Sequence, residues 1–192
     1  MAAARWMAVL FTGILMAAPA GAEVRDLLGL PGPVAVDGQS YRLAWSAQPS
    51  PDYRKHEYVP VGQSVDHYDQ MLLVERVAGD LKVIDAVASQ MAMLEQRQGT
   101  DPLVRFEVLQ KDARNEVDLD FLMSGRDAQG ESVVEWNLYR YLPMTSGVLL
   151  FGISHRAYGD TAVQAFLDGL DHLRATQTGM FLRTPVPSVT GG

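Results

Sequence analysis

Apolar and polar residues alternate with a period of two along most of the chain, the pattern of strands that bury one face. Before residue 80, the strand-like runs are interrupted by Asp37-Gly38, a pair that favours a hairpin turn, and by Pro60 and Gly62. Four further runs follow without a helical pattern between them, over about 104–109, 116–123, 132–142 and 147–154. Because the last run is apolar on both faces, we expect it near the centre of a sheet.

Two segments show the three- or four-residue spacing of an amphipathic helix instead. The first is expected to begin with Asp80 as N-cap, to end at Gly99 and to bury one apolar stripe, made of Leu81, Ile84, Val87, Met91 and Leu94. The second begins near Asp160, where Thr161 and Gln164 have capping-box spacing, and runs through Gly169. The order of elements predicts an α+β fold, with an antiparallel sheet of about six or seven strands flanked by two amphipathic helices.

The first 22 residues have the three parts of a cleavable secretory signal. Arg5 supplies the basic start, an apolar stretch follows, and Ala20 and Ala22 precede an expected cut before Glu23. That stretch is shorter than the roughly 20 residues that span a bilayer. We expect a periplasmic or secreted protein without an integral membrane segment after cleavage. The rest divides into one domain over 23–176 and a disordered tail over 177–192.

Composition narrows the partners and the chemistry. The chain has no cysteine, so its core must hold the fold without a disulfide. The formal net charge is −7, whereas a nucleic-acid partner requires clustered cationic charge, so none is expected. A glycine-rich phosphate loop, a His-Glu-x-x-His pair and a Gly-x-Ser-x-Gly elbow are all missing. We therefore expect neither a cofactor nor a metal, and no catalytic residue is identified.

Residues 66–69 place two acids, a histidine and a tyrosine side by side, as a metal or catalytic site would. Asp66, His67 and Asp69 cannot all point at one ion from a helical or extended segment. We expect instead a single helical turn between two strands, capped by Ser64, with Tyr68 packing inward. A metal held by His67 is the alternative.

Three acids alternate along one face of the strand predicted at 116–123, namely Glu116, Asp118 and Asp120. Neighbours in this row lie roughly 7 Å apart, so two of them could act as general acid and base or hold a cation. The interpretation that we favour is the solvated face of an antiparallel sheet. In the next strand Trp136 falls on the apolar side and is expected in the core.

Candidate binding residues lie late in two strands. Tyr139 and Tyr141 fall on the polar side of their strand, and exposed aromatic residues beside polar groups are typical of an interface. His155 and Arg156 follow the central strand, where Arg156 could bind a carboxylate or phosphate or could pair with an acid of the chain. With Tyr68, these residues form the predicted binding set.

The segments "EYVPVGQ", "MLLVER" and "FGISHR", placed around a helix and a meander, resemble small bacterial exported proteins with a PsbP-like α/β/α sandwich. The resemblance covers about residues 34–176, with Tyr68 where tryptophan is more frequent. It implies a scaffold used by non-enzymatic modules such as photosystem accessory subunits, a Ran-binding factor and export chaperones.

We therefore predict a non-enzymatic periplasmic accessory or binding protein that contacts a protein or small ligand in the cell envelope. The alternative is a small exported hydrolase that uses acids of the 116–120 row with His155 or His67. Catalysis requires these groups to converge in one concave pocket with shifted pKa values, whereas a contact function predicts that they are scattered.

Overall fold

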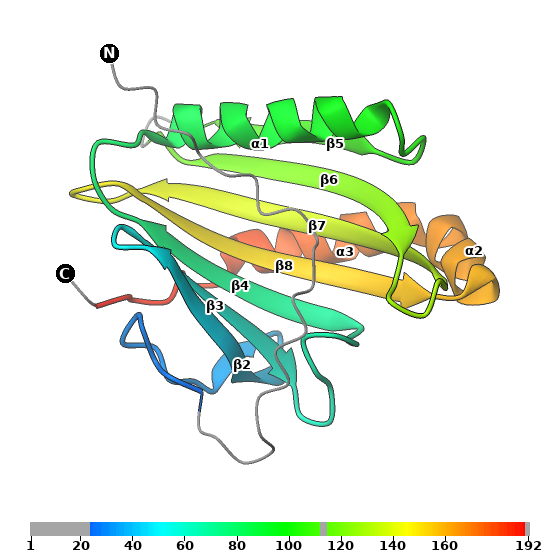
Figure 1. Ribbon diagram of the computed structural model, residues 1–192, viewed down its shortest axis with the longest axis horizontal. Coiled ribbons are helices and arrows are strands. Elements are labelled where there is room, and N and C mark those ends of the chain that lie inside the picture. The colour runs from blue at the N-terminus through cyan, green and yellow to red at the C-terminus, as the bar shows by residue number, and fades with distance from the viewer. Residues whose placement is uncertain (1–23, 112–114, 191–192) are drawn as a thin grey trace.

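One antiparallel sheet of eight strands forms the centre of the protein, and three helices pack against it (Figure 1). The computed structural model describes residues 24–111 and 115–190, so the predicted signal over 1–22 lies outside the described residues. The strands are β1 (Val34–Val36), β2 (Gln39–Ser50), β3 (Tyr53–Pro60), β4 (Gln70–Val77), β5 (Arg105–Lys111), β6 (Val117–Arg126), β7 (Ser132–Pro143) and β8 (Val148–Tyr158). The helices are α1 (Val83–Gln98), α2 (Asp160–Asp168) and α3 (Leu170–Arg183). The α+β class and the antiparallel sheet are confirmed, with more strands and one more helix than predicted.

The strands follow the order β1-β2-β3-β4-β8-β7-β6-β5 across the sheet. The first four strands form a meander, and after α1 the chain builds a second meander from the far edge back to the centre. There β8 pairs with β4 on one side and with β7 on the other. The prediction that this apolar strand lies centrally is confirmed, and β5 becomes a terminal strand.

Helices cover the two faces of the sheet unequally. On the α1 face, Val87 and Leu94 of the helix pack in one core cluster with Leu119 and Phe121 of β6. On the α3 face, Phe181 packs in a second cluster with strand residues that include Trp136. Figure 1 shows α1 along the β5–β6 end of the sheet, with α2 and α3 behind it. Residues of both faces of β6, β7 and β8 are therefore buried.

The helices differ from the prediction in where they begin and end. Helix α1 starts at Val83, so Val83 faces the sheet while Ile84 is 50% exposed. The second predicted helix is two helices, because Gly169 ends α2 before α3 begins, and no side chain caps α2. Among the described helices none is both long enough and apolar enough to cross a bilayer.

The acidic row of β6 is not a solvated face, and that prediction is wrong for Asp118 and Asp120, which are both buried. The register pairs Leu122 with Trp136, so the acidic side of β6 lies on the same face of the sheet as the apolar side of β7. Because α3 and its neighbours cover this face, the acids enter the interior. The expectation that Trp136 lies in the core is confirmed, since it is fully buried.

The segment predicted as a disordered tail is ordered up to residue 190. Helix α3 continues to Arg183, and Val186 and Val189 then pack against the core cluster of the α3 face. The N–H of Thr190 donates a hydrogen bond to the carbonyl of Leu28 at 2.7 Å. The sequence did not indicate this packing, because the segment after α3 is irregular and buries single residues rather than a periodic stripe of apolar residues.

The turn between β3 and β4 is tight rather than helical. The N–H of His67 donates to the hydroxyl of Ser64 at 3.2 Å, so the predicted cap is present, but two backbone hydrogen bonds between the same residues close a compact turn. Tyr68 is buried, and Val65 packs on the core cluster of the α1 face. The inward packing predicted for Tyr68 is confirmed.

Candidate functional site

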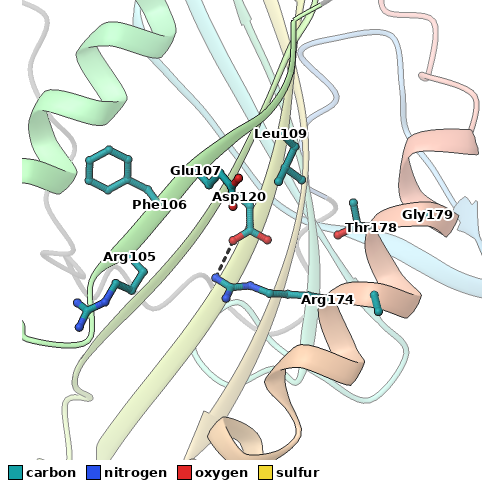
Figure 2. Close-up of a pocket in the computed structure, with 9 residues that line it drawn as sticks. Arg105, Phe106, Glu107, Leu109, Asp120, Arg174, Thr178 and Gly179 are labelled. Carbon is teal, nitrogen blue, oxygen red and sulfur yellow. Dashed lines mark hydrogen bonds and ion pairs between the residues drawn. The ribbon is translucent and has the colours of Figure 1, made fainter.

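A groove of about 440 Å³ lies on the α3 face, between the β5 end of the sheet and α3 (Figure 2). Strands β5 and β6 supply Glu107 and Asp120, and Arg174 and Thr178 come from α3. The alternation of each strand aims Glu107 and Asp120 at this face, since the neighbouring Phe106 and Phe121 pack on the other. We call it the Asp120 groove.

Asp120 is the most constrained group of this groove. Its Oδ2 accepts a hydrogen bond from Trp136 Nε1 at 2.6 Å, and its Oδ1 accepts one from the guanidinium of Arg174 at 2.7 Å. Burial raises the pKa of Asp120 above its ordinary value, and the nearby Glu107 acts in the same direction, while the two donors oppose both. Both carboxylate oxygens are thus engaged within the protein.

Arg105 also borders the groove, but its guanidinium makes its hydrogen bonds elsewhere. Figure 2 shows its side chain directed away from Asp120. Its guanidinium donates instead to the carbonyl oxygens of Pro102 at 2.9 Å and Val104 at 2.7 Å. The charges around Asp120 are therefore the cation of Arg174 and the exposed carboxylate of Glu107.

The outer boundary of the groove is an open edge of the sheet. Strand β5 is terminal, and in the part of the chain that the structure describes only β6 pairs with it. Val108 is 40% exposed and Leu109 39% exposed, and a register irregularity lies between Val108 and Gln110. A terminal strand carries backbone groups that can pair with another chain. This edge and the Asp120 groove form one surface, which we call the β5 edge.

A second polar cluster lies on the α1 face, where the turn before β4 meets β7 and β8. Glu135 accepts a hydrogen bond from the hydroxyl of Tyr68 at 2.6 Å and forms an ion pair with Arg156 at 2.5 Å. The guanidinium of Arg156 also lies 4.2 Å from the centre of the Tyr68 ring. Burial raises the pKa of Tyr68 well above its ordinary value, and the Glu135 carboxylate adds to this. The structure therefore shows Arg156 paired with an acid of the chain, which was the alternative to binding a carboxylate or phosphate ligand.

His155 points to the opposite face from Arg156, as alternation requires. It lines a shallower groove of about 360 Å³ together with Gln70 and residues of α2 and α3. Its Nε2 is buried and has no hydrogen-bond partner among the described residues. Burial lowers the pKa of His155 to about 4, and the side chain of Gln177 opposes this effect without forming a regular hydrogen bond. The ring is therefore neutral near pH 7.

The predicted exposure of Tyr139 and Tyr141 is wrong. Tyr141 is 4% exposed and Tyr139 is half-buried, and both rings pack on the α1 face. The ring of Tyr139 meets Phe121 edge to face at 4.8 Å between centroids. Residues on the polar side of β7 are covered because the α1 face is itself a core. Of the predicted binding set, Tyr68 contacts Arg156, and the rings of Tyr139 and Tyr141 lie 6.3 Å apart between centroids. Their roles in binding remain predictions.

The groups proposed for hydrolysis do not converge. Asp120 and His155 lie on one face but line two different grooves, and His67 stacks on Tyr158 at 4.1 Å beyond the turn. No group of three or more acidic, histidine or cysteine side chains within the described ranges is arranged to hold a metal. The sequence reasoning missed Arg174 and the β5 edge. The adjacent apolar pair Val108-Leu109, which breaks the alternation, was the available signal for the irregular edge.

Comparison with known proteins places the chain in a family without defining an activity. A family model matches residues 28–182, so the chain belongs to that family, which is uncharacterised. The match extends through α2 and nearly to the end of α3. Searches among curated proteins and among solved structures each found no match.

Proposed function

We propose that this member of an uncharacterised family is a non-enzymatic accessory protein of the cell envelope that acts by contact with another polypeptide at the β5 edge. The export signal expected at residues 1–22 supports the location. The resemblance of the sequence to PsbP-like exported proteins supports a scaffold of the binding and assembly kind. Fold alone does not define function, so the properties of the surface itself must support the assignment.

The observation that carries the proposal is the contrast between the interior polar groups and the β5 edge. Glu135 and Asp120 are each bonded by partners from neighbouring elements, which is how buried charges are stabilised in a rigid fold. At β5, in contrast, a terminal strand leaves Val108 and Leu109 exposed beside a groove. Exposed apolar residues on a terminal strand, which has one unpaired edge, favour addition of a further strand.

A hydrolase would have to use Asp120, the acid of the row that lines a groove. A general acid needs an oxygen free to meet the substrate, whereas Trp136 and Arg174 occupy both oxygens of Asp120. Asp118 and His155 do not line the same groove. The arrangement therefore favours contact over hydrolysis.

Site-specific photo-crosslinking in living cells tests this proposal. A photo-reactive amino acid at Val108 is expected to give a discrete adduct, because the β5 edge meets its partner there. Val61 is the matched control, since it is 81% exposed but lies in the turn after β3. An adduct at Val108 whose crosslinked peptide maps to one polypeptide supports the proposal, and equal labelling at Val61, or none at either position, contradicts it.

A further inference from the structure

Strand β5 ends the sheet with a short sequence, Arg105-Phe106-Glu107, in which opposite charges stand on either side of one aromatic residue. Arg105 and Glu107 are both exposed and lie on the same face of the strand, while Phe106 packs toward α1. We propose that the occupant of the β5 edge is the β5 strand of a second copy, paired antiparallel about a two-fold axis through Phe106. This inference rests on the proposed function and names the polypeptide at that surface.

The charge pattern selects this register. A two-fold axis at Phe106 places Arg105 of each copy directly opposite Glu107 of the other, so two cross-strand ion pairs form at once. Centring the axis on Glu107 would place two like carboxylates opposite each other, which is unfavourable. A chain with formal net charge −7 repels its own copies at a distance, so such local complementarity is what a self-contact requires.

In the proposed dimer, the guanidinium of Arg105 from the second copy lies at the Asp120 groove. Glu107 lies near the buried Asp120, and Figure 2 shows both side chains on the same side of the strand. In the paired edge, Arg105 of the second copy approaches Glu107 from the open side and adds a cation to this acidic end of the groove. To do so it leaves the two carbonyl oxygens that it contacts within its own chain.

The irregularity of β5 limits the contact. Regular pairing with β6 is interrupted between Val108 and Gln110, which bends the strand after Val108. The proposed ladder therefore covers residues 105–107, and in this register Val108 lies opposite residue 104 of the other copy. It does not continue through Val104, whose backbone N–H and carbonyl already form hydrogen bonds within their own chain. Such a short contact predicts a weak, concentration-dependent dimer rather than an obligate one.

Sedimentation velocity on purified protein over a dilution series tests the dimer through charge exchange. Arg105→Glu and Glu107→Arg each turn two attractive pairs into repulsive ones, so each should raise the dimer dissociation constant roughly tenfold or more. The double variant R105E/E107R restores opposite charges and should return the constant to near that of the original protein. Because both side chains are exposed, these variants are expected to fold.

Disulfide trapping tests the register independently, because the chain has no cysteine of its own. Phe106→Cys should crosslink two copies under mild oxidation, since the Cβ atoms of residue 106 in the two copies face each other across the axis. Val108→Cys is the control and should not crosslink, because residue 108 faces residue 104 of the other copy.

The inference fails if the protein is a monomer up to about 0.5 mM, if the double variant dimerises as weakly as the single ones, or if residue 108 crosslinks instead of residue 106. A monomeric protein that still forms a specific heterologous adduct through Val108 in cells would refute the second copy while leaving the contact function intact. A dimer whose formation is unaffected by the charge variants would refute this edge as its interface.

Discussion

Glu135 is an acid in the interior of the sheet, and its environment shows how single residues hold this fold. It lies between β6 and β8 and is 5% exposed. Arg156 and Tyr68 complete its bonding, so it joins the β3–β4 turn to the central strands. A buried ion pair contributes little beyond an apolar equivalent, but removal of one member leaves the other charged and unpaired.

Glu135→Gln should therefore lower the free energy of unfolding by about 3 kcal/mol, because Arg156 stays buried without its counter-charge. Urea denaturation measures this loss. Glu131→Gln makes the same chemical change at an exposed site and should alter stability by about 0.5 kcal/mol or less. Equal effects of the two substitutions would show that the ion pair is not a structural element.

His155 should make stability depend on pH. Its pKa is about 4 in the folded protein and near 6.5 in the unfolded chain, so between these values only the unfolded chain takes up the proton. This contribution to stability is intact above pH 6.5 and falls as the solution is acidified toward pH 4. From pH 7.5 to pH 5 the loss should reach about 2 kcal/mol.

His155→Gln removes this proton uptake, so the difference in unfolding free energy between the two pH values should shrink by the same amount relative to the original protein. Chemical denaturation at both pH values measures it. An unchanged difference would mean that the imidazole takes up its proton in the folded protein as readily as in the unfolded chain.

At the scale of elements, strand positions were predictable from alternation and the central place of β8 from its two apolar faces. The burial of Asp118 and Asp120 was not predictable from alternation, because it depends on which strand pairs with β6 and on the helix that covers that face. Likewise, the polar side of β7 suggested exposure of Tyr141, yet α1 covers it. Alternation reports two faces of a strand but does not tell which face meets a helix.

The β7–β8 hairpin supplies an element-scale prediction. Gly147 has φ +100°, and a Cβ added there would lie 1.8 Å from the carbonyl oxygen of Val77. Gly147→Ala should therefore destabilise the protein by roughly 3 kcal/mol. Gly130 has φ +81° but open space around it, so Gly130→Ala should cost only roughly 1 kcal/mol. Thermal unfolding of both variants gives the comparison, and equal losses would contradict the close approach of the hairpin to Val77.

At the scale of the whole molecule, the two ends of the described chain meet on the α3 face. Thr190 binds the backbone of Leu28, and Arg140 of β7 donates to the carbonyl of Thr184 at 2.8 Å. These contacts join distant parts of the sequence. No local pattern in the segment after α3 could therefore indicate them.

A chain that ends at Arg183 should lose about 2 kcal/mol of stability, because it gives up the half-buried Val186 and Val189 with their hydrogen-bonded neighbours. Calorimetry should show a lower melting temperature than for a chain that ends at Thr190. A disordered segment, as the sequence alone suggested, would leave the melting temperature unchanged.

The candidate surface was harder to predict than the fold. Tyr68, His155 and Arg156 attract attention as residue types, but the side chains of all three are buried in the folded protein. Val108 and Glu107 look ordinary in the sequence and gain significance only because β5 is the last strand. A terminal position is a property of the complete sheet, which depends on every strand pairing at once.

Nuclear magnetic resonance of the ¹⁵N-labelled protein, kept dilute enough to remain monomeric and mixed with an excess of unlabelled protein in cell-envelope extract, tests the central claim most directly, because it reports contact at every backbone amide. The contact function at the β5 edge predicts that signals of residues 105–109 lose intensity first, while those of β3 and β4 keep theirs. Loss centred on His155 and α2, or no loss at any position, would contradict it.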